Sequence, residues 1–371
     1  MLGKNENNLE FRIMKKTFIC TKENPLRCQI NEEEKFLMDE IAIEGFLSDT
    51  DLMVLREMSN QYVMRVIDMS CVNELSAEID YYLENDELSF DKLEELYLPE
   101  NVEAFPLTMF MNCNRLKIVE IPESLKELGE YFLAFCPNID NLYVPGKLRP
   151  YQWFNSQDTF LVGSAKRYIS DRDTWSMMED DDDLYASDGV LYRQRMLYRY
   201  PAGDKRSHFV VPEGTDSISQ LAICNNKHLK SITIPSSCVD FWSGAICNCP
   251  SLETLIFKNE KFFFNSDCNH PFDFNDDPGP HGLRQLPNLK DVYLYAKDPD
   301  EVSQLFDGLY NMDNVVLHVP CFCANNYKRH MITTVDYEKG VLSFRQGSYG
   351  NRFLSIEEFD PIDFIEDDEM N

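Results

Sequence analysis

Histidine and cysteine, which carry much of acid–base, nucleophilic and metal chemistry, are scattered through the 371 residues of this chain. No two of the six histidines have the spacing of metal ligands on one helix face. The sequence also lacks a phosphate-binding loop and the GxGxxG, GxSxG and HExxH signatures. His318 lies between Leu317 and Val319 on an expected strand, so we interpret it as a surface strand residue rather than a base. These residues predict no catalytic site.

Three groups of cysteine and histidine lie close enough in sequence to be considered as metal ligands: Cys247 with Cys249, Cys321 with Cys323, and Cys268 with His270 and His281. Zinc sites usually combine C-x₂₋₄-C with a second ligand pair, and the first two groups are C-x-C. Because free cysteine behaves as a small, commonly buried hydrophobe, core packing is favoured for these two. The third group lies in an unassigned loop and stays open as an alternative.

Two acidic segments are candidate calcium ligands, the run 179–183 and the loop 271–282. Calcium takes six to eight oxygen ligands, but neither segment has the spaced acids, glycine and terminal glutamate of an EF-hand loop. Adjacent acids direct their side chains differently, so solvated loops are favoured and calcium binding stays open.

The strongest pattern is a repeat of 23 residues. Five similar phrases end in proline: LEELYLP (93–99), LKIVEIP (116–122), IDNLYVP (139–145), RSHFVVP (206–212) and LKSITIP (229–235). LETLIFK (252–258) continues the second block with lysine in place of proline, and weaker copies follow at LKDVYLY (289–295) and NVVLHVP (314–320). The last apolar pair of each phrase alternates as in a strand, and proline then ends the pairing. One unit cannot cover its own apolar face, so the units must stack into a solenoid.

The stretches SLKELGEYFLAFCPNIDNLYVP (124–145) and CVDFWSGAICNCPSLETLIF (238–257) resemble BspA-like leucine-rich repeats, whose unit reads roughly IPxSVTxIGxxAFxxCxxLxxI. Residues 41–70 resemble the N-terminal cap of that family, with a strand, a helix capped by Ser48 or Thr50, and a first repeat strand. SDGVLYRQRMLYRYPAG (187–203) resembles its DGVLY hairpin, with Asp188-Gly189 as the turn. The resemblance covers about residues 17–330 and specifies a repeat class rather than an activity.

We therefore predict an α/β repeat fold: a leucine-rich-repeat solenoid with a parallel sheet on one face, terminal caps and an inserted β-hairpin segment. The expected parts are a frayed N-terminus (1–16), an N-terminal cap with the first repeat strand (17–92), repeat block 1 (93–150), an insertion with the hairpin (151–205), repeat block 2 (206–330) with an irregular insert (260–287), and a C-terminal cap with an acidic tail (331–371). Lys258 replaces the expected proline of the repeat.

Strand alternation directs one residue of each phrase outward, and stacking aligns these residues into a row. The expected row is Tyr97, Glu120, Tyr143, Val210, Thr233, Ile256, Tyr293 and His318, and the predicted binding residues within it are Tyr97, Glu120, Tyr143, Thr233, Ile256 and Tyr293. Tyrosine offers contact area with a hydrogen-bonding group, as binding surfaces require. Strand propensity alone is the alternative explanation for these side chains.

The net charge of −29 argues against nucleic acid and anionic membrane as partners. The short stretch Lys261–Phe264 is interpreted as a packed strand or loop anchor. No apolar run is long enough to cross a bilayer, and the N-terminal residues lack a signal-peptide core, so a cytoplasmic location is expected from the sequence as written.

We predict a non-catalytic scaffold that binds a protein partner through the exposed sheet face, without a cofactor. The family resemblance implies an alternative, an exported cell-surface adhesin that binds host or matrix components. A third hypothesis is a metal-dependent or thiol enzyme built on the inserted segments 150–186 or 260–287.

Overall fold

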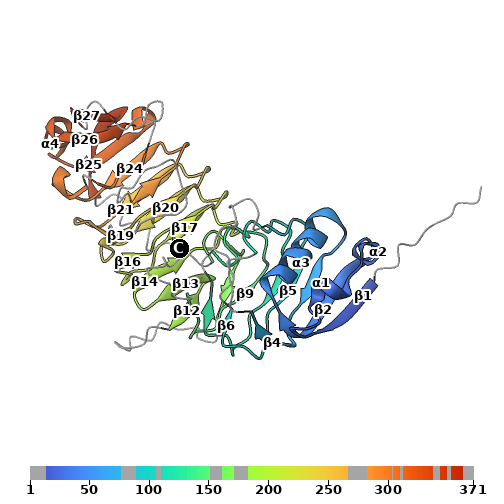
Figure 1. The fold of residues 1–371 in the computed structure, drawn as a ribbon. Coiled ribbons are helices and arrows are strands. Elements are labelled where there is room, and N and C mark those ends of the chain that lie inside the picture. The colour runs from blue at the N-terminus through green and yellow to red at the C-terminus, as the bar shows by residue number, and fades with distance from the viewer. Residues whose placement is uncertain are drawn as a thin grey trace, which may run out of the picture.

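The computed structural model describes residues 14–76, 89–105, 110–129, 131–150, 161–170, 183–265, 282–302, 304–309, 312–336, 343–348 and 352–361. The chain forms an elongated, bent stack of strands, with the N-terminal elements at one end and β24 to β27 at the other (Figure 1). The predicted solenoid of parallel strands is confirmed.

The N-terminal end consists of two long parallel strands covered by short helices. Strand β1 (Met14–Cys20) pairs with β2 (Met38–Leu47), and α1 (Leu26–Gln29), α2 (Glu32–Lys35) and α3 (Asp49–Gln61) complete this end. Of the two predicted caps, Ser48 is the N-cap of α3: its Oγ accepts from Asp51 N at 3.2 Å, and Asp51 Oδ2 accepts from Ser48 N at 3.1 Å. Strand β4 (Val72–Leu75) pairs with the far end of β2.

The strands of the repeat phrases, and further strands that continue the same rows, lie side by side and parallel. In the first half these are β3 (Val66–Asp68), β5 (Glu95–Tyr97) and β7 (Ile118–Glu120), followed by β9 (Leu142–Tyr143) and β11 (Tyr168–Ile169). In the second half they are β15 (His208–Val210), β18 (Ser231–Ile234), β21 (Thr254–Phe257), β24 (Asp291–Leu294), β25 (Val316–Pro320) and β28 (Ser355–Phe359). The 23-residue spacing is kept where Leu96 pairs with Val119 and Ile232 with Leu255.

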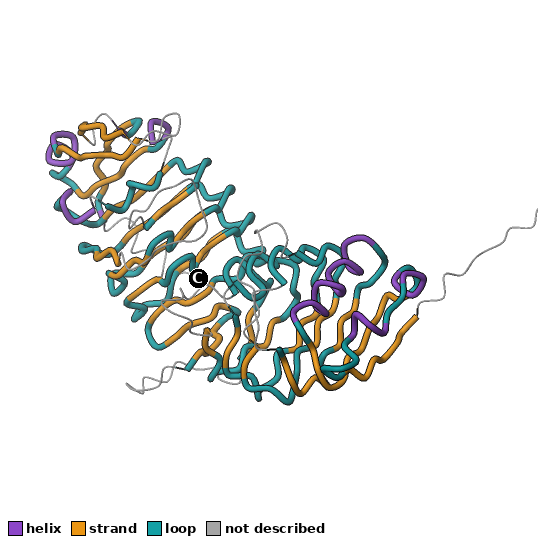
Figure 2. Tube along the Cα trace, in the orientation of Figure 1, coloured by secondary structure: helices purple, strands orange, loops and turns teal. Residues whose placement is uncertain are grey.

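The return segments of the repeats are turns and very short strands. One row of such strands is β6 (Ala104–Phe105), β8 (Glu127–Leu128) and β10 (Arg149–Pro150). A second row is β16 (Ser217–Ile218), β19 (Asp240–Trp242) and β22 (Phe263–Asn265). A third row is β17 (Ile223–Cys224), β20 (Ile246–Cys247) and β23 (Leu283–Arg284). Single left-handed residues such as Leu133 (φ 56°) and Leu221 (φ 52°) turn the chain, which interrupts any helix. Helices within the described residues are therefore found toward the two ends (Figure 2).

The segment 260–287, predicted to be irregular, is in register with the repeats at both of its ends. Strand β22 pairs with β19, aligning Phe264 with Phe241, and β23 pairs with β20, aligning Leu283 with Ile246. The regular spacing is lost because the chain between β22 and β23 is longer than in the other repeats. Lys258 N donates to Ile234 O at 2.9 Å, a bond that a proline at this position could not form.

The predicted hairpin is present and separates two hydrophobic cores. Strands β12 (Leu184–Ser187) and β13 (Val190–Arg193) are antiparallel, and their turn places Asp188 (φ 49°) and Gly189 (φ 79°) in the left-handed region. Strand β14 (Met196–Arg199) then pairs parallel with β16 and rejoins the stack. Both faces of β13 and β14 are buried: Leu191 and Tyr198 belong to the core of the first half, and Tyr192 and Leu197 to that of the second.

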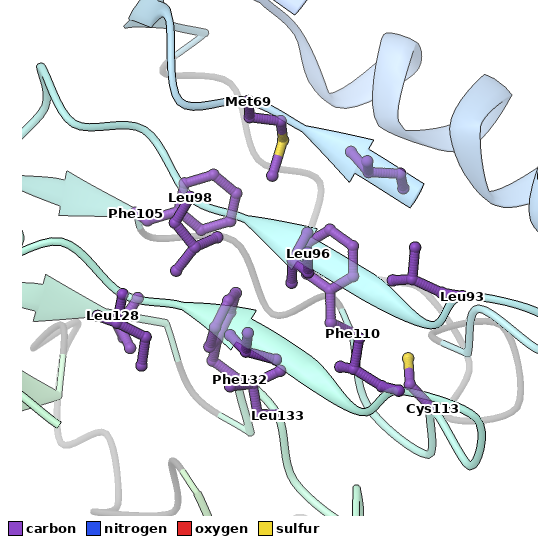
Figure 3. Close-up of a cluster of buried hydrophobic side chains, with 14 of the residues drawn as sticks. Met69, Leu93, Leu96, Leu98, Phe105, Phe110, Cys113, Leu128, Phe132 and Leu133 are labelled. Atoms are coloured by element: carbon purple, nitrogen blue, oxygen red, sulfur yellow. The ribbon is translucent and has the colours of Figure 1, made fainter. Parts of the chain in front are cut away.

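Each core is a continuous column of inward-facing side chains from successive repeats. Figure 3 shows Leu96, Phe105, Phe110 and Cys113 of one repeat against Phe132 and other residues of the next. The repeat cysteines Cys113, Cys136 and Cys249 are fully buried, as packing requires. Burial raises the pKa of the Cys113 and Cys249 thiols, which keeps them neutral.

The C-terminal end continues the stack and adds a small antiparallel pair. The 3₁₀ turns η2 (Pro299–Val302) and η3 (Met312–Asn314) precede β25, and α4 (Ala324–Arg329) follows it. Strands β26 (Met331–Asp336) and β27 (Ser343–Ser348) pair antiparallel, and β28 then pairs with β25. Within the described part of the chain, no helix combines the length and the apolar character needed to cross a membrane.

Candidate binding face

The residues predicted to form an outward row are aligned across neighbouring strands. Pairing aligns Tyr97 with Glu120 in the first half, and Thr233 with Ile256 in the second. The outer row, as the structure gives it, consists of Asp68, Tyr97, Glu120, Tyr143, Ile169, Val210, Thr233, Ile256, Tyr293, His318 and Glu357. Between β7 and β9 the ladder is continued by Asp140 N, which donates to Lys117 O at 2.9 Å.

A second row lies two residues earlier on the same strands and faces the same way. It consists of Val66, Glu95, Ile118, Asn141, Arg167, His208, Ser231, Thr254, Asp291, Val316 and Ser355. The residues between the rows, such as Leu96, Ile232 and Leu255, are fully buried. The two rows together form one surface, which we call the repeat face.

Large apolar side chains on the repeat face are exposed to solvent. Ile118 is 46% exposed, Ile169 39% and Val210 57%. Tyr97, Tyr143 and Tyr293 are half-buried, so each presents part of its ring to solvent. This combination of exposed aliphatic and tyrosine side chains in register is typical of a contact surface.

Sequence reasoning missed three members of the outer row. Asp68 lies on the predicted first repeat strand, and its offset from the following phrases could have identified it. Ile169 aligns with Tyr143 although the two are separated by an irregular interval, and only the short Tyr168-Ile169 strand signals it. Glu357 aligns with His318 across residues that have no repeat pattern.

The hairpin turn fills the position between the two halves of the repeat face. Tyr168 N donates to Gly189 O at 3.0 Å, which ties the turn to β11. On the other side, Arg206 Nη2 donates to Asp188 O at 3.2 Å, next to β15. The face is therefore bridged at this point by the Asp188-Gly189 turn.

Tyrosines in the first half are held by carboxylates. Tyr97 donates its hydroxyl to Glu95 Oε2 at 2.9 Å, and Tyr143 donates to Glu123 Oε1 at 3.1 Å. The hydrogen bond to Glu95, burial and neighbouring carboxylates raise the pKa of Tyr97 to about 12. The Tyr97 phenol therefore stays a protonated donor near neutral pH, and both hydrogen bonds fix the rings on the face.

An aromatic cluster ends the outer row in the second half. The Tyr293 and His318 rings stack with centroids 4.0 Å apart and planes at 6°, and Phe359 packs edge-on to Tyr293 at 5.5 Å. His318 Nε2 lies 2.9 Å from Asp291 Oδ1. Burial is the main cause that raises the pKa of Tyr293. His318 is thus a packed strand residue on the face.

The described candidate metal ligands do not assemble into a site. Cys247 and Cys249 are buried in the stack, whereas Cys321 is exposed and Cys323 half-buried. No group of three or more potential ligands that could hold a metal ion occurs among the described residues. Cys268, His270 and His281 lie outside the described residues, as do 179–182 and 271–281 of the two acidic segments. Asp183, at the end of the acidic run, pairs with Arg149 Nη2 at 2.9 Å.

The phenylalanine stretch after Lys261 is mainly a packing element, as its sequence suggested. The Phe262 ring stacks on Phe241 at a centroid distance of 5.5 Å and on Phe264 at 6.2 Å. Phe263, on β22, is 61% exposed.

Comparison with known proteins supports the repeat assignment. A sequence model described as the BspA type leucine rich repeat region matches in six copies, over residues 82–157 and 202–270. No curated protein matches the chain.

Three solved bacterial structures are similar to the chain at low sequence identity. A leucine rich cell surface protein from Faecalibacterium prausnitzii is 18% identical, with 87% of this chain and 73% of that chain covered and a TM-score of 0.49. The pneumococcal vaccine antigen PcpA is 15% identical, with 80% of this chain and 78% of that chain covered and a TM-score of 0.43. A leucine-rich repeat protein from Eubacterium ventriosum is 14% identical, with 80% of this chain and 86% of that chain covered and a TM-score of 0.35. The six matched copies and the stacked strands with 23-residue spacing show that residues 82–157 and 202–270 contain leucine-rich repeats of the BspA type.

Proposed function

We propose that this chain is a non-catalytic scaffold that binds a protein partner through the repeat face. The observation that carries the proposal is the alignment of half-buried tyrosines and exposed aliphatic residues in the two rows of the repeat face. Rings that are already fixed by neighbours lose little conformational entropy on binding, so they are suited to act as contact anchors.

The rigidity of the face supports this role. Its strands are tied to their neighbours by backbone hydrogen bonds, and the residues beneath, such as Leu96 and Ile232, are fully buried. A partner would meet a surface whose shape is set before binding. Repeat proteins present extended surfaces of this kind.

The test uses the partner captured from the native cell, purified and titrated against variants of the full chain. Tyr97→Ala and Tyr143→Ala should each weaken binding by roughly tenfold or more, as anchor residues do. Phe36→Ala is the matched control, because Phe36 is 61% exposed but lies in the N-terminal cap, away from the repeat face. Unchanged affinity of both tyrosine variants would exclude the repeat face as the contact surface.

The exported adhesin and the enzyme on inserted segments remain predictions. Cell fractionation distinguishes the first, since an adhesin must be found outside the cytoplasm. Metal analysis of the purified chain tests the metal-dependent form of the second, through the group Cys268, His270 and His281.

A further inference from the structure

A turn at the C-terminal end of the stack carries two cysteines that the core does not enclose. Cys321 is exposed and Cys323 is half-buried, whereas repeat cysteines such as Cys113 and Cys249 are fully buried. Core packing, which we expected for this pair, is therefore wrong for Cys321. The two cysteines follow β25 and directly precede the first residues of α4, so this turn presents sulfur at the surface of the molecule.

The chain bends sharply between the two cysteines. Cys323 N donates to Pro320 O at 3.0 Å, which closes a β-turn, and the residue in between, Phe322, has φ 70°. A positive φ at this position is typical of a type II turn and is normally supplied by glycine or asparagine. Phe322 is 93% exposed, so contacts of its ring do not explain this backbone conformation.

The turn brings the two cysteines within the reach of a disulfide. Even in an extended chain, the Cα atoms of residues separated by one position are at most about 7 Å apart, and a bend shortens this distance. Disulfides join Cα atoms that are about 4.4–6.8 Å apart. Burial, then the Glu358 carboxylate and, more weakly, Cys321 raise the pKa of Cys323. The exposed Cys321 is therefore the sulfur that an external reagent meets first.

We propose that Cys321 and Cys323 form a thiol–disulfide exchange site whose oxidant is a small-molecule disulfide. The Cys321 thiolate attacks one sulfur of the external disulfide, so a mixed disulfide forms and one thiolate leaves. The Cys323 thiolate then attacks Cys321 Sγ and displaces the second thiolate. Two thiols of the chain are thereby oxidised to one disulfide, the external disulfide is reduced to two thiols, and the two protons pass to these products.

The position of the turn makes this exchange reversible, since exposed disulfides are reduced more easily than buried structural ones. In the reduced chain, Cys321 Sγ donates to Phe359 O at 3.4 Å, a hydrogen bond that an oxidised sulfur cannot donate. Phe359 packs edge-on to Tyr293, so the exchange takes place beside the C-terminal end of the repeat face. The inference does not rest on the proposed function, because it concerns only the chemistry of this turn.

The test incubates the reduced, folded, full-length chain with glutathione disulfide, alkylates the remaining thiols in denaturant and identifies each cysteine by peptide mass spectrometry. The peptide that contains Cys321 and Cys323 should lose two hydrogen atoms and carry neither glutathione nor an alkyl group. Excess reduced glutathione should restore both thiols. Cys28 and Cys71, which are exposed and 43 positions apart in the sequence, should instead carry glutathione.

Single substitutions separate the two steps of the exchange. Cys323→Ser should stop it at the mixed disulfide, so that Cys321 carries glutathione. The matched control Cys28→Ser/Cys71→Ser should form the same disulfide as the wild-type chain, because both residues lie far from the turn in the sequence. The buried Cys113 should stay free of glutathione in every variant, which verifies that the chain is folded.

Two free thiols at the turn of the wild-type chain, or a glutathione adduct on Cys321 there, would overturn the inference, since the two cysteines would then be unreactive or react singly. A disulfide that joins two copies of the chain through Cys321 would overturn it as well.

Discussion

At the residue scale, the polar side chains with the largest expected effect on stability are those that folding buries away from water. Asp51 is fully buried at the start of α3 and accepts from Ser48 N, Ser48 Oγ at 2.6 Å, and Arg27 N at 3.0 Å. One carboxylate thus satisfies backbone donors of two helices. Ser48 was one of the two N-caps predicted from the sequence, whereas the roles of Asp51, in the capping box and in the contact with Arg27, come from the structure.

Asp51→Ala should destabilise the chain by about 2–4 kcal/mol, because it leaves these buried donors without their acceptor. Asp49→Ala is the matched control in the same helix turn: Asp49 accepts from Thr50 N at 2.7 Å in an exposed setting, and its loss should cost less than about 1 kcal/mol. Urea unfolding of both variants measures the difference. Equal losses would contradict the assignment of Asp51 as a shared cap.

A pair of carboxylates in the return segments, Asp216 and Asp240, makes the stability of the chain depend on pH. Burial, and then the Asp216 carboxylate on the preceding repeat, raise the pKa of Asp240. An acid whose pKa is raised by folding costs stability while it is ionised. That cost is present at neutral pH, fades as the pH falls through the folded pKa, and is absent below the unfolded pKa near 3.8.

Asp240→Asn should therefore stabilise the chain at neutral pH by about 0.5–1 kcal/mol, the scale of like charges on neighbouring strands. The gain should shrink on acidification. Thermal unfolding across a pH series checks this, with Asp313→Asn, at an exposed position, as the control. A gain that is constant with pH would show that the carboxylate charge is not its source.

At the scale of elements, the hairpin and the chain that leaves it join the two halves. After β14, Ala202 N donates to Ser164 O at 3.1 Å and Gly203 N to Ala165 O at 2.7 Å, so this chain is tied to the first half. The hairpin itself follows from Asp188-Gly189, but this attachment does not follow from any local signal. It brings Gly203 against the backbone of Pro137, where a Cβ would lie 2.1 Å from the carbonyl oxygen.

Gly203→Ala should destabilise the chain by more than about 2 kcal/mol, since backbone rather than a side chain must move. Gly282→Ala is a matched control: its Cβ would meet the Phe264 side chain at 3.2 Å, which can shift, so a loss below about 1 kcal/mol is expected. Thermal unfolding of both variants measures the two losses of stability. Similar stability of the two would show that the contact with Pro137 is not close.

At the scale of the whole molecule, the stack contains two large cores that meet at the hairpin, and a smaller buried cluster that joins residues of both halves, such as Val162 and Leu221. Leu191 faces the first core, whereas Tyr192, the next residue of β13, faces the second. In a solenoid, the coupling between neighbouring units sets how cooperatively the array unfolds. The hairpin and this smaller cluster are therefore where the two halves are coupled. The domain limits predicted from the sequence remain our proposal.

Leu191→Ala should cost about 2–4 kcal/mol and separate the unfolding of the two halves, because it opens a cavity where they meet. Leu255→Ala, fully buried within the second half, should cost a similar amount without that separation. Hydrogen exchange read by mass spectrometry distinguishes the two, since it reports protection for each half. Loss of protection in both halves at the same denaturant concentration in Leu191→Ala would rule out this role of the hairpin.

Several parts of the structure were determined by the sequence alone, because their signals are local or strictly periodic. The Ser48 cap and the Asp188-Gly189 turn each depend on a few adjacent residues, and the 23-residue spacing fixes pairs such as Tyr97 with Glu120. The predicted members of the outer row are therefore placed as expected, although their role in binding stays a prediction. Any unit of this length must be covered by its neighbours, so stacking followed from the pattern.

Where the repeat spacing is irregular, only the tertiary structure determined which strands pair. Ile169 pairs with Tyr143, and β22 and β23 join the stack, although the intervals before them differ from the repeat. Extra residues between strands add little to the entropic cost of closing a loop, so pairing can persist without any periodic trace in the sequence. The return segments became turns and short strands rather than helices for a related reason: cross-strand partners determine such short elements, and these partners are distant in the chain.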